Sequence, residues 1–101
     1  MKKLVILLAM LGAGVSLQAQ ANADLAKSKA CMACHSVDKK IVGPAFHDVA
    51  VKYAGEKGAD AKLAAKIMKG GSGVWGTMAM PPNAVTEQEA LTLAKWVLAQ
   101  K

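Results

Sequence analysis

Cys31-Met32-Ala33-Cys34-His35 contains both cysteines of the chain and one of its two histidines. On a helical turn, residues i, i+3 and i+4 share one face, so both thiols and the imidazole can meet one planar ligand. C-x-x-C-H is the attachment pattern for c-type haem. Each thiol adds to a porphyrin vinyl group, and the adjacent histidine reaches the iron as its proximal ligand. We therefore predict one covalently bound haem c, with thioethers at Cys31 and Cys34 and with His35 on the iron.

Two other uses of these residues remain open. A C-x-x-C pair can form a reversible disulfide of the thioredoxin type, although that motif belongs to a βαβ setting that the helical periodicity of this chain does not supply. A structural zinc site needs four ligands, and the strong soft donors are Cys31, Cys34, His35 and His47. Their spacing differs from that of zinc fingers because His35 directly follows the second cysteine.

The first 21 residues have the layout of a secretory signal peptide. Lys2 and Lys3 precede an apolar run over residues 4–15, and Ala19-Gln20-Ala21 offers small residues at the cleavage spacing. This apolar run of 12 residues is too short to cross a hydrocarbon core as a helix. We expect cleavage after Ala21, which leaves one domain over residues 22–101.

The predicted mature domain is small, basic and rich in alanine. Its 80 residues carry 11 lysines, no arginine and seven acids, a net charge of +4. Of its 40 apolar residues, 16 are alanine, so only 24 larger side chains can build a core. A domain of this size is marginally stable without a disulfide, a metal or a bound group. An apolar macrocycle tethered twice would supply the missing core.

Apolar residues recur at helical spacing, and no convincing alternating strand is present. We expect an all-α domain with helices from about Asn22 towards Cys34, from Phe46 to Gly55, around Leu63–Ile67 and from Thr86 onwards. Gly70-Gly71 ends the third helix. Thr86 and Glu89 have the spacing of a capping box, in which each side chain bonds the backbone N–H of the other.

A second axial ligand would decide whether the iron carries electrons or reacts with an added molecule. The candidates are Met32, Met68, Met78, Met80 and His47. Met80 lies on a long loop (Gly70–Val85), 45 residues after His35, where the chain can cross to the other face of the ring. Pro81-Pro82 follow it and stiffen the backbone where a ligand must be held. We predict Met80 as the ligand; the other use of such a methionine is to fill a gap in the core.

The chain carries five recognisable motifs, namely Cys31-Met32-Ala33-Cys34-His35, Val42-Gly43-Pro44-Ala45, Gly73-Val74-Trp75-Gly76, Met80-Pro81-Pro82-Asn83 and Leu93-Ala94-Lys95-Trp96-Val97-Leu98. Together they closely resemble the small bacterial class I cytochromes c, in particular the c-551/c-552 type. The resemblance covers essentially all of residues 22–101. It implies four or so short helices wrapped around one haem, with one haem edge exposed.

The resemblance also implies roles for individual residues. The Pro44 carbonyl would receive the ring N–H of His35, Asn83 would contact the sulfur of Met80, and the Trp75 indole would reach a haem propionate. Trp96 matches a packing residue. Three positions depart from the family pattern: Ala30 stands where glycine is frequent, Lys66 where arginine often is, and Ala79 where proline often precedes the ligand, which lets Met78 compete for the iron.

These observations predict a monomeric periplasmic one-electron carrier rather than an enzyme. By resemblance, its donor would be a membrane respiratory complex or another cytochrome, and its acceptor a terminal oxidase, a nitrite reductase or a peroxidase. We expect no nucleic-acid binding, because the chain is exported and lacks arginine, and no membrane insertion. The rival functions are a haem enzyme or gas sensor with a vacant sixth site, and a thiol–disulfide oxidoreductase.

Overall fold

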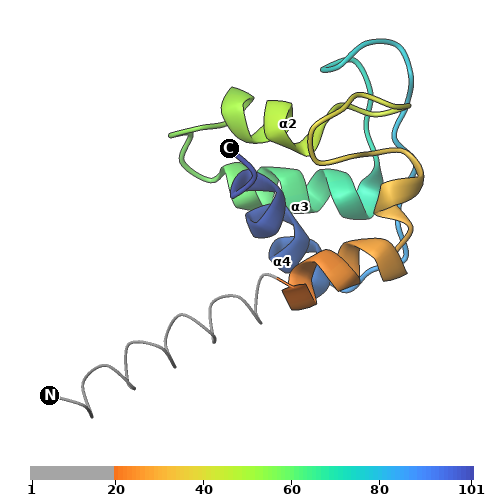
Figure 1. The fold of residues 1–101 in the computed structure, drawn as a ribbon, viewed down its shortest axis with the longest axis vertical. Coiled ribbons are helices and arrows are strands. Elements are labelled where there is room, and N and C mark those ends of the chain that lie inside the picture. Colours follow the sequence, from red (N-terminus) through yellow and green to blue (C-terminus); the bar gives the residue numbers. More distant parts are fainter. Residues whose placement is uncertain (1–19) are drawn as a thin grey trace, which may run out of the picture.

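The described part of the chain, residues 20–101 of a computed structural model, is helical (Figure 1). Residues 20–28 form a helical stretch, followed by the 3₁₀ turn η1 (Cys31–Ala33) and the helices α2 (Phe46–Lys52), α3 (Ala59–Lys69) and α4 (Glu87–Leu98). Within these residues the only extended pairings are two isolated bridges, His35 with Lys40 and Gly71 with Met80. The predicted all-α class is confirmed here. The predicted signal peptide lies outside the described residues, apart from its last two positions.

The first helix is shorter than its sequence predicts. It ends at residue 28 instead of continuing towards Cys34. Ala30 adopts a left-handed conformation (φ 61°, ψ 20°) and is the one non-glycine residue with positive φ in the described part of the chain. Because a left-handed residue cannot continue a right-handed helix, the haem-attachment motif begins a separate turn. In that turn the Cys31 carbonyl accepts the backbone N–H groups of Cys34 (3.3 Å) and His35 (3.0 Å).

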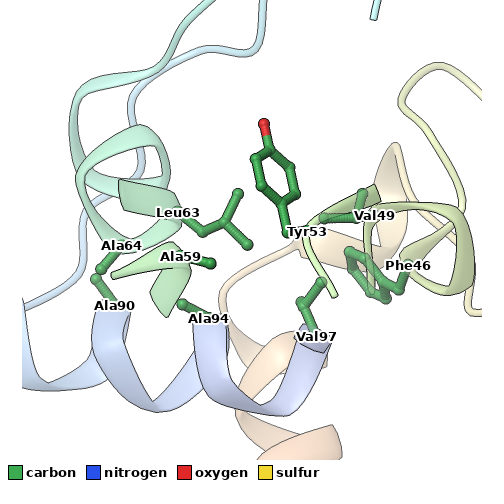
Figure 2. Packing of buried hydrophobic residues seen from close by; sticks show 9 residues of the cluster. All are labelled: Phe46, Val49, Tyr53, Ala59, Leu63, Ala64, Ala90, Ala94 and Val97. Atoms are coloured by element: carbon green, nitrogen blue, oxygen red, sulfur yellow. The ribbon is translucent and has the colours of Figure 1, made fainter. Parts of the chain in front are cut away.

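Helices α3 and α4 pack against each other through small side chains. Ala64 of α3 lies against Ala90 of α4, Ala94 of α4 lies on the side of Ala59, and both alanines of α4 are fully buried (Figure 2). Side chains this small let the two helix backbones approach closely. The alanine-rich composition therefore allows α3 and α4 to pack closely. The larger apolar side chains fill the rest of the core.

Those larger side chains come mainly from α2 and its C-terminal end. Phe46, Val49 and Tyr53 are buried and extend the core cluster beside Leu63 and Val97 (Figure 2). The Phe46 ring also meets the Trp96 ring edge-on, with 5.4 Å between centroids and an interplanar angle of 76°. Trp96 is partly buried and packs against the core, as the family resemblance implies.

The predicted capping box at the start of α4 is confirmed. The Thr86 hydroxyl accepts the Glu89 backbone N–H at 3.1 Å, and the Glu89 carboxylate accepts the Thr86 N–H at 2.9 Å. Glu89 also lies 3.6 Å from the Lys29 ammonium, which connects α4 to the end of the first helical stretch. The other boundaries differ modestly from expectation, because α2 ends at Lys52 and α3 begins at Ala59.

Residues 70–86 connect α3 to α4 without forming a helix, as the density of glycine and proline predicts. None of the helices formed by the described residues has the length and apolar content that a membrane span requires.

Candidate functional site

A cavity of about 570 Å³ opens between η1 and the segment after it, the helices α2, α3 and α4, and the loop after α3. Its walls are mostly apolar, and its volume lies in the range of small-molecule and cofactor sites. Six of the seven predicted site residues line it: Cys31, Cys34, His35, Pro44, Trp75 and Met80. The structure thus brings both cysteines, one histidine and two methionines, Met78 and Met80, to the same cavity.

His35 is held on several sides. Its Nδ1 lies 2.7 Å from the Pro44 carbonyl oxygen, which can only accept, so Nδ1 carries a proton and Nε2 is the nitrogen left to bind a metal. The ring stacks on Phe46 with 4.9 Å between centroids and an interplanar angle of 24°. Gly43 touches the ring so closely that an added Cβ would lie 2.5 Å from Cε1. These contacts fix both the tautomer and the orientation of the imidazole.

The two cysteines are free and half-buried on the η1 turn. Burial raises the pKa of the Cys31 thiol above its ordinary value and outweighs the opposing effect of a backbone hydrogen bond. Dithiol oxidoreductases need the reverse, a thiol whose pKa is lowered so that the nucleophilic thiolate is present. The environment of Cys31 therefore disfavours the thioredoxin-type alternative.

Met80 and Met78 both line the cavity, but the chain holds them differently. Met80 is half-buried, and its backbone pairs with Gly71 through two hydrogen bonds: Met80 N–H to the Gly71 carbonyl at 2.7 Å and Gly71 N–H to the Met80 carbonyl at 3.1 Å. Met78 is 71% exposed. The structure therefore fixes the backbone at Met80 and leaves the Met78 side chain largely in solvent.

Trp75 lies at the rim of the cavity and is 41% exposed. The Lys52 ammonium sits over its ring at 5.7 Å from the centroid. Lys40 and Lys66 also line the cavity. Cationic side chains thus lie near the rim, where carboxylates of a bound group would be favoured.

Asn83 is the predicted site residue that the structure does not bring to the cavity wall. Its side-chain amide donates to the Ile67 carbonyl at 3.0 Å, and its backbone N–H donates to the same oxygen at 3.1 Å. These bonds fasten Asn83 to the end of α3, and the expected contact with the sulfur of Met80 stays a prediction.

A zinc site finds no support in the described part of the chain, where no group of three or more histidine, cysteine or acidic side chains could hold a metal ion. His47 lies away from the motif, with Nδ1 donating to the Gln100 carbonyl at 2.9 Å. Haem fits the residues better. The cavity is apolar, two thiols can be alkylated, and nitrogen and thioether donors are both present.

The sequence matches the Cytochrome c family over residues 19–101. The chain belongs to the cytochrome c family. A cytochrome c-551 of Pseudomonas aeruginosa is 54% identical over 99 aligned residues, covering 94% of this chain and 95% of that protein. A cytochrome c-551 of Ectopseudomonas mendocina is 62% identical over 78 residues, covering 77% and 95%. The crystal structure of wild-type Nitrosomonas europaea cytochrome c552 superposes with a TM-score of 0.76 at 52% identity, covering 78% of this chain and 99% of that one.

Membership of the cytochrome c family settles the fold and the cofactor. The domain has the class I cytochrome c fold, and cytochromes c bind haem c covalently. They transfer electrons and are not enzymes, so this chain is a small cytochrome c electron carrier.

Three glycines of the site do not stand out in the sequence as site residues. Gly43 packs on the His35 ring, while Gly70 and Gly71 contact the Met80 segment. Gly43 belongs to the Val42-Gly43-Pro44-Ala45 motif, in which only Pro44 received a role, and Gly70-Gly71 ends a helix, which is also an ordinary turn signal.

Proposed function

We propose that this cytochrome is a periplasmic one-electron carrier whose haem is attached to Cys31 and Cys34 and whose iron is bound by His35 and Met80. The observation that carries the proposal is the shared cavity, which both thiols, the imidazole and the Met80 side chain line together. The haem supplies a one-electron Fe(III)/Fe(II) couple. Histidine and methionine ligation raises the reduction potential and leaves no open coordination position.

The surrounding residues keep the ligands in place. The Pro44 carbonyl holds the proton on Nδ1 of His35, which leaves Nε2 for the iron and raises the basicity of the ring. The paired backbone of Gly71 and Met80 supports the methionine. Little rearrangement is then required when the oxidation state changes.

Met80 is preferred to Met78 as the ligand because its backbone is fixed. A ligand held by two backbone hydrogen bonds and followed by two prolines keeps its position, whereas Met78 lies in an exposed stretch with no such support. Met78 is therefore the matched control in the test of the ligand.

Residues 22–101 form the proposed mature domain, and residues 1–21 the signal peptide that directs it to the periplasm. The family match begins at residue 19, and the Ectopseudomonas relative aligns over 78 residues. The start of the family match is close to the boundary that the cleavage pattern indicates, and the 78 aligned residues are close to the 80 residues of the proposed mature domain.

The partners are proposed to be acidic at their docking surfaces. The mature chain is basic, with a net charge of +4, and Lys40, Lys52 and Lys66 lie at or near the cavity rim. Opposite charges accelerate encounter and lose effect as salt rises. The donor is a membrane respiratory complex or another cytochrome, and the acceptor a terminal oxidase, nitrite reductase or peroxidase. We therefore expect electron transfer with these partners to become slower as the salt concentration rises.

Optical spectra of the exported protein test the proposal. We expect sharp c-type bands on reduction and a weak Fe(III)–methionine sulfur charge-transfer band on oxidation. Met80→Ala should keep the haem, lose the sulfur band, lower the potential and let the ferrous protein bind carbon monoxide, whereas Met78→Ala should change none of these.

Other outcomes would redirect the assignment. Loss of the sulfur band in Met78→Ala but not in Met80→Ala would make Met78 the ligand. Wild-type protein with haem but no sulfur band would revive the open-site enzyme or sensor. A chain without haem, from a host able to attach it, would leave the thiol–disulfide oxidoreductase as the remaining function.

A further inference from the structure

Gly70 stands where α3 ends and the loop carrying Met80 begins. Its backbone has φ 77° and ψ −178°, a combination that is essentially restricted to glycine. Its N–H still bonds the Lys66 carbonyl at 2.7 Å, so the helix continues to this residue before the chain turns sharply. The end of α3 is therefore defined by a conformation that an ordinary L-residue would strain.

Gly70 also packs directly against the backbone of the Met80 segment. An added Cβ would overlap the Met80 carbonyl oxygen and would lie 3.0 Å from the Pro82 nitrogen and 3.1 Å from the Pro81 carbonyl carbon. All three neighbours are main-chain atoms, and two belong to residues whose φ is fixed by a proline ring. The backbone from Met80 to Pro82 cannot easily move aside. Its close approach to the end of α3 therefore requires a residue without a side chain at position 70.

Hydrogen bonds fasten the same segment to the helix end. Gly71 and Met80 exchange two backbone bonds, and Asn83 donates twice to the Ile67 carbonyl. The last four carbonyls of a helix lack partners within it, and Ile67 is one of them. The Met80–Asn83 segment therefore serves as the C-terminal cap of α3.

We propose that Gly70 is a positioning residue for the distal ligand. It lets the Met80 backbone lie directly on the end of α3, and this contact sets where the methionine side chain enters the cavity and how readily it leaves. The inference rests on the proposed ligation by Met80. A change confined to position 70 should then act on the iron although no atom of Gly70 needs to touch the haem.

The test uses Gly70→Ala in the haem-loaded protein, with Gly58→Ala as the matched control. Gly58 begins the same helix with φ 75°, but an added Cβ would meet nothing within 4 Å. Both substitutions strain the backbone, more strongly at position 70 because its φ and ψ are essentially restricted to glycine, and only the one at position 70 presses on the Met80 segment. We expect Gly70→Ala alone to weaken the sulfur charge-transfer band and lower the reduction potential. Cyanide binding to the ferric protein should accelerate about tenfold or more, because entry requires local opening of this segment.

Met80→Ala, measured in parallel, distinguishes an error in the ligand assignment from an error in the role of Gly70. If Met80→Ala keeps the sulfur band, the ligand assignment is wrong. If it loses the band while Gly70→Ala matches Gly58→Ala in band, potential and cyanide rate, the assignment stands and the role of Gly70 is refuted.

Hydrogen exchange of the wild-type protein gives a test that does not depend on folding of the variant. The Met80 amide, bonded to the Gly71 carbonyl, should be protected to about the same extent as the Gly70 amide that ends α3, because the two should open together. An unprotected Met80 amide beside a protected Gly70 amide would overturn the proposal.

Discussion

The Nδ1 atom of His35 lies 2.7 Å from the carbonyl oxygen of Pro44, while Gly43, one residue earlier, touches the same ring. The bond selects the tautomer, and the glycine permits the ring to sit close enough to make it. Gly43 has no positive φ, so its need for a hydrogen side chain comes from the contact and not from backbone conformation.

Gly43→Ala should displace the His35 ring. The new methyl would have to clear Cε1 and Nδ1, which would lie at 2.5 and 2.8 Å, so the bond to Pro44 should lengthen. A weaker bond makes the imidazole less basic and stabilises Fe(III) less, so the reduction potential should rise, with a stability loss of about 1–3 kcal/mol from overpacking. Voltammetry and chemical unfolding measure the two effects.

Gly71→Ala is the control for this substitution, because an added Cβ there would meet nothing closer than 4.0 Å and the φ of Gly71 is not positive. Its potential should stay near that of the wild type. Equal potentials for the variants at positions 43 and 71 would show that the contact with His35 has no electronic consequence.

Ala90→Leu should force α3 and α4 apart. Ala90 is fully buried in the cluster where the two helices meet and does not line the cavity, so the larger side chain has no space and should cost about 1–3 kcal/mol or more. Ala61→Leu, at an exposed position of α3, should leave stability nearly unchanged. Unfolding in urea compares the two, and an equal loss in both would contradict the close packing of these helices.

The local features of this chain were predictable because each depends on neighbours in sequence. The capping box of Thr86 and Glu89 and the helical class follow from spacing alone, and the structure has both. The haem motif is likewise local, since five consecutive residues carry it, and the family confirms the cofactor.

The remaining features depend on contacts between distant segments. Gly43 meets a ring eight residues earlier, and Gly70 meets the backbone at Met80, so their neighbours in sequence do not show what either glycine contacts. The left-handed Ala30 overrides a helical pattern that would otherwise continue. Asn83 could bond either a sulfur or a free helix carbonyl, and only the arrangement of α3 shows that Ile67 is its partner.

Ala30→Gly should stabilise the protein. A left-handed conformation costs an L-residue about 1–2 kcal/mol, and glycine removes most of this strain. Glycine also gives the unfolded chain about 0.4–1 kcal/mol of additional entropy, so the net gain should be up to about 1 kcal/mol. Thermal unfolding of the haem-loaded protein measures it.

Ala33→Gly provides the comparison for Ala30→Gly, since Ala33 lies without positive φ in the 3₁₀ turn that Ala30 precedes. Ala33→Gly should lower stability, because it increases the entropy of the unfolded chain and relieves no backbone strain. A stability loss at position 30 as large as that at position 33 would mean that the left-handed conformation stores no strain.

The capping box makes stability depend on pH in the acid range. The Glu89 carboxylate accepts the Thr86 backbone N–H, and this bond, helped by the Lys29 charge, lowers the pKa of Glu89 despite some opposing desolvation. A carboxyl whose pKa is lower in the folded than in the unfolded state stabilises the protein above the unfolded value, about 4.3. That contribution is lost as pH falls through the lower, folded-state pKa.

Glu89→Gln should therefore flatten the acid side of the stability profile. The difference in urea midpoint between wild type and variant should be largest at neutral pH, shrink below about pH 4.3 and then level off at the contribution of the uncharged carboxyl. Added salt should reduce only the part due to Lys29, because the hydrogen bond to Thr86 is not screened in the same way. Glu87→Gln removes a charge from the same first turn of α4 without touching the capping box. If its profile flattens as much as that of Glu89→Gln, the effect belongs to helix charge in general and not to the bond between Glu89 and Thr86.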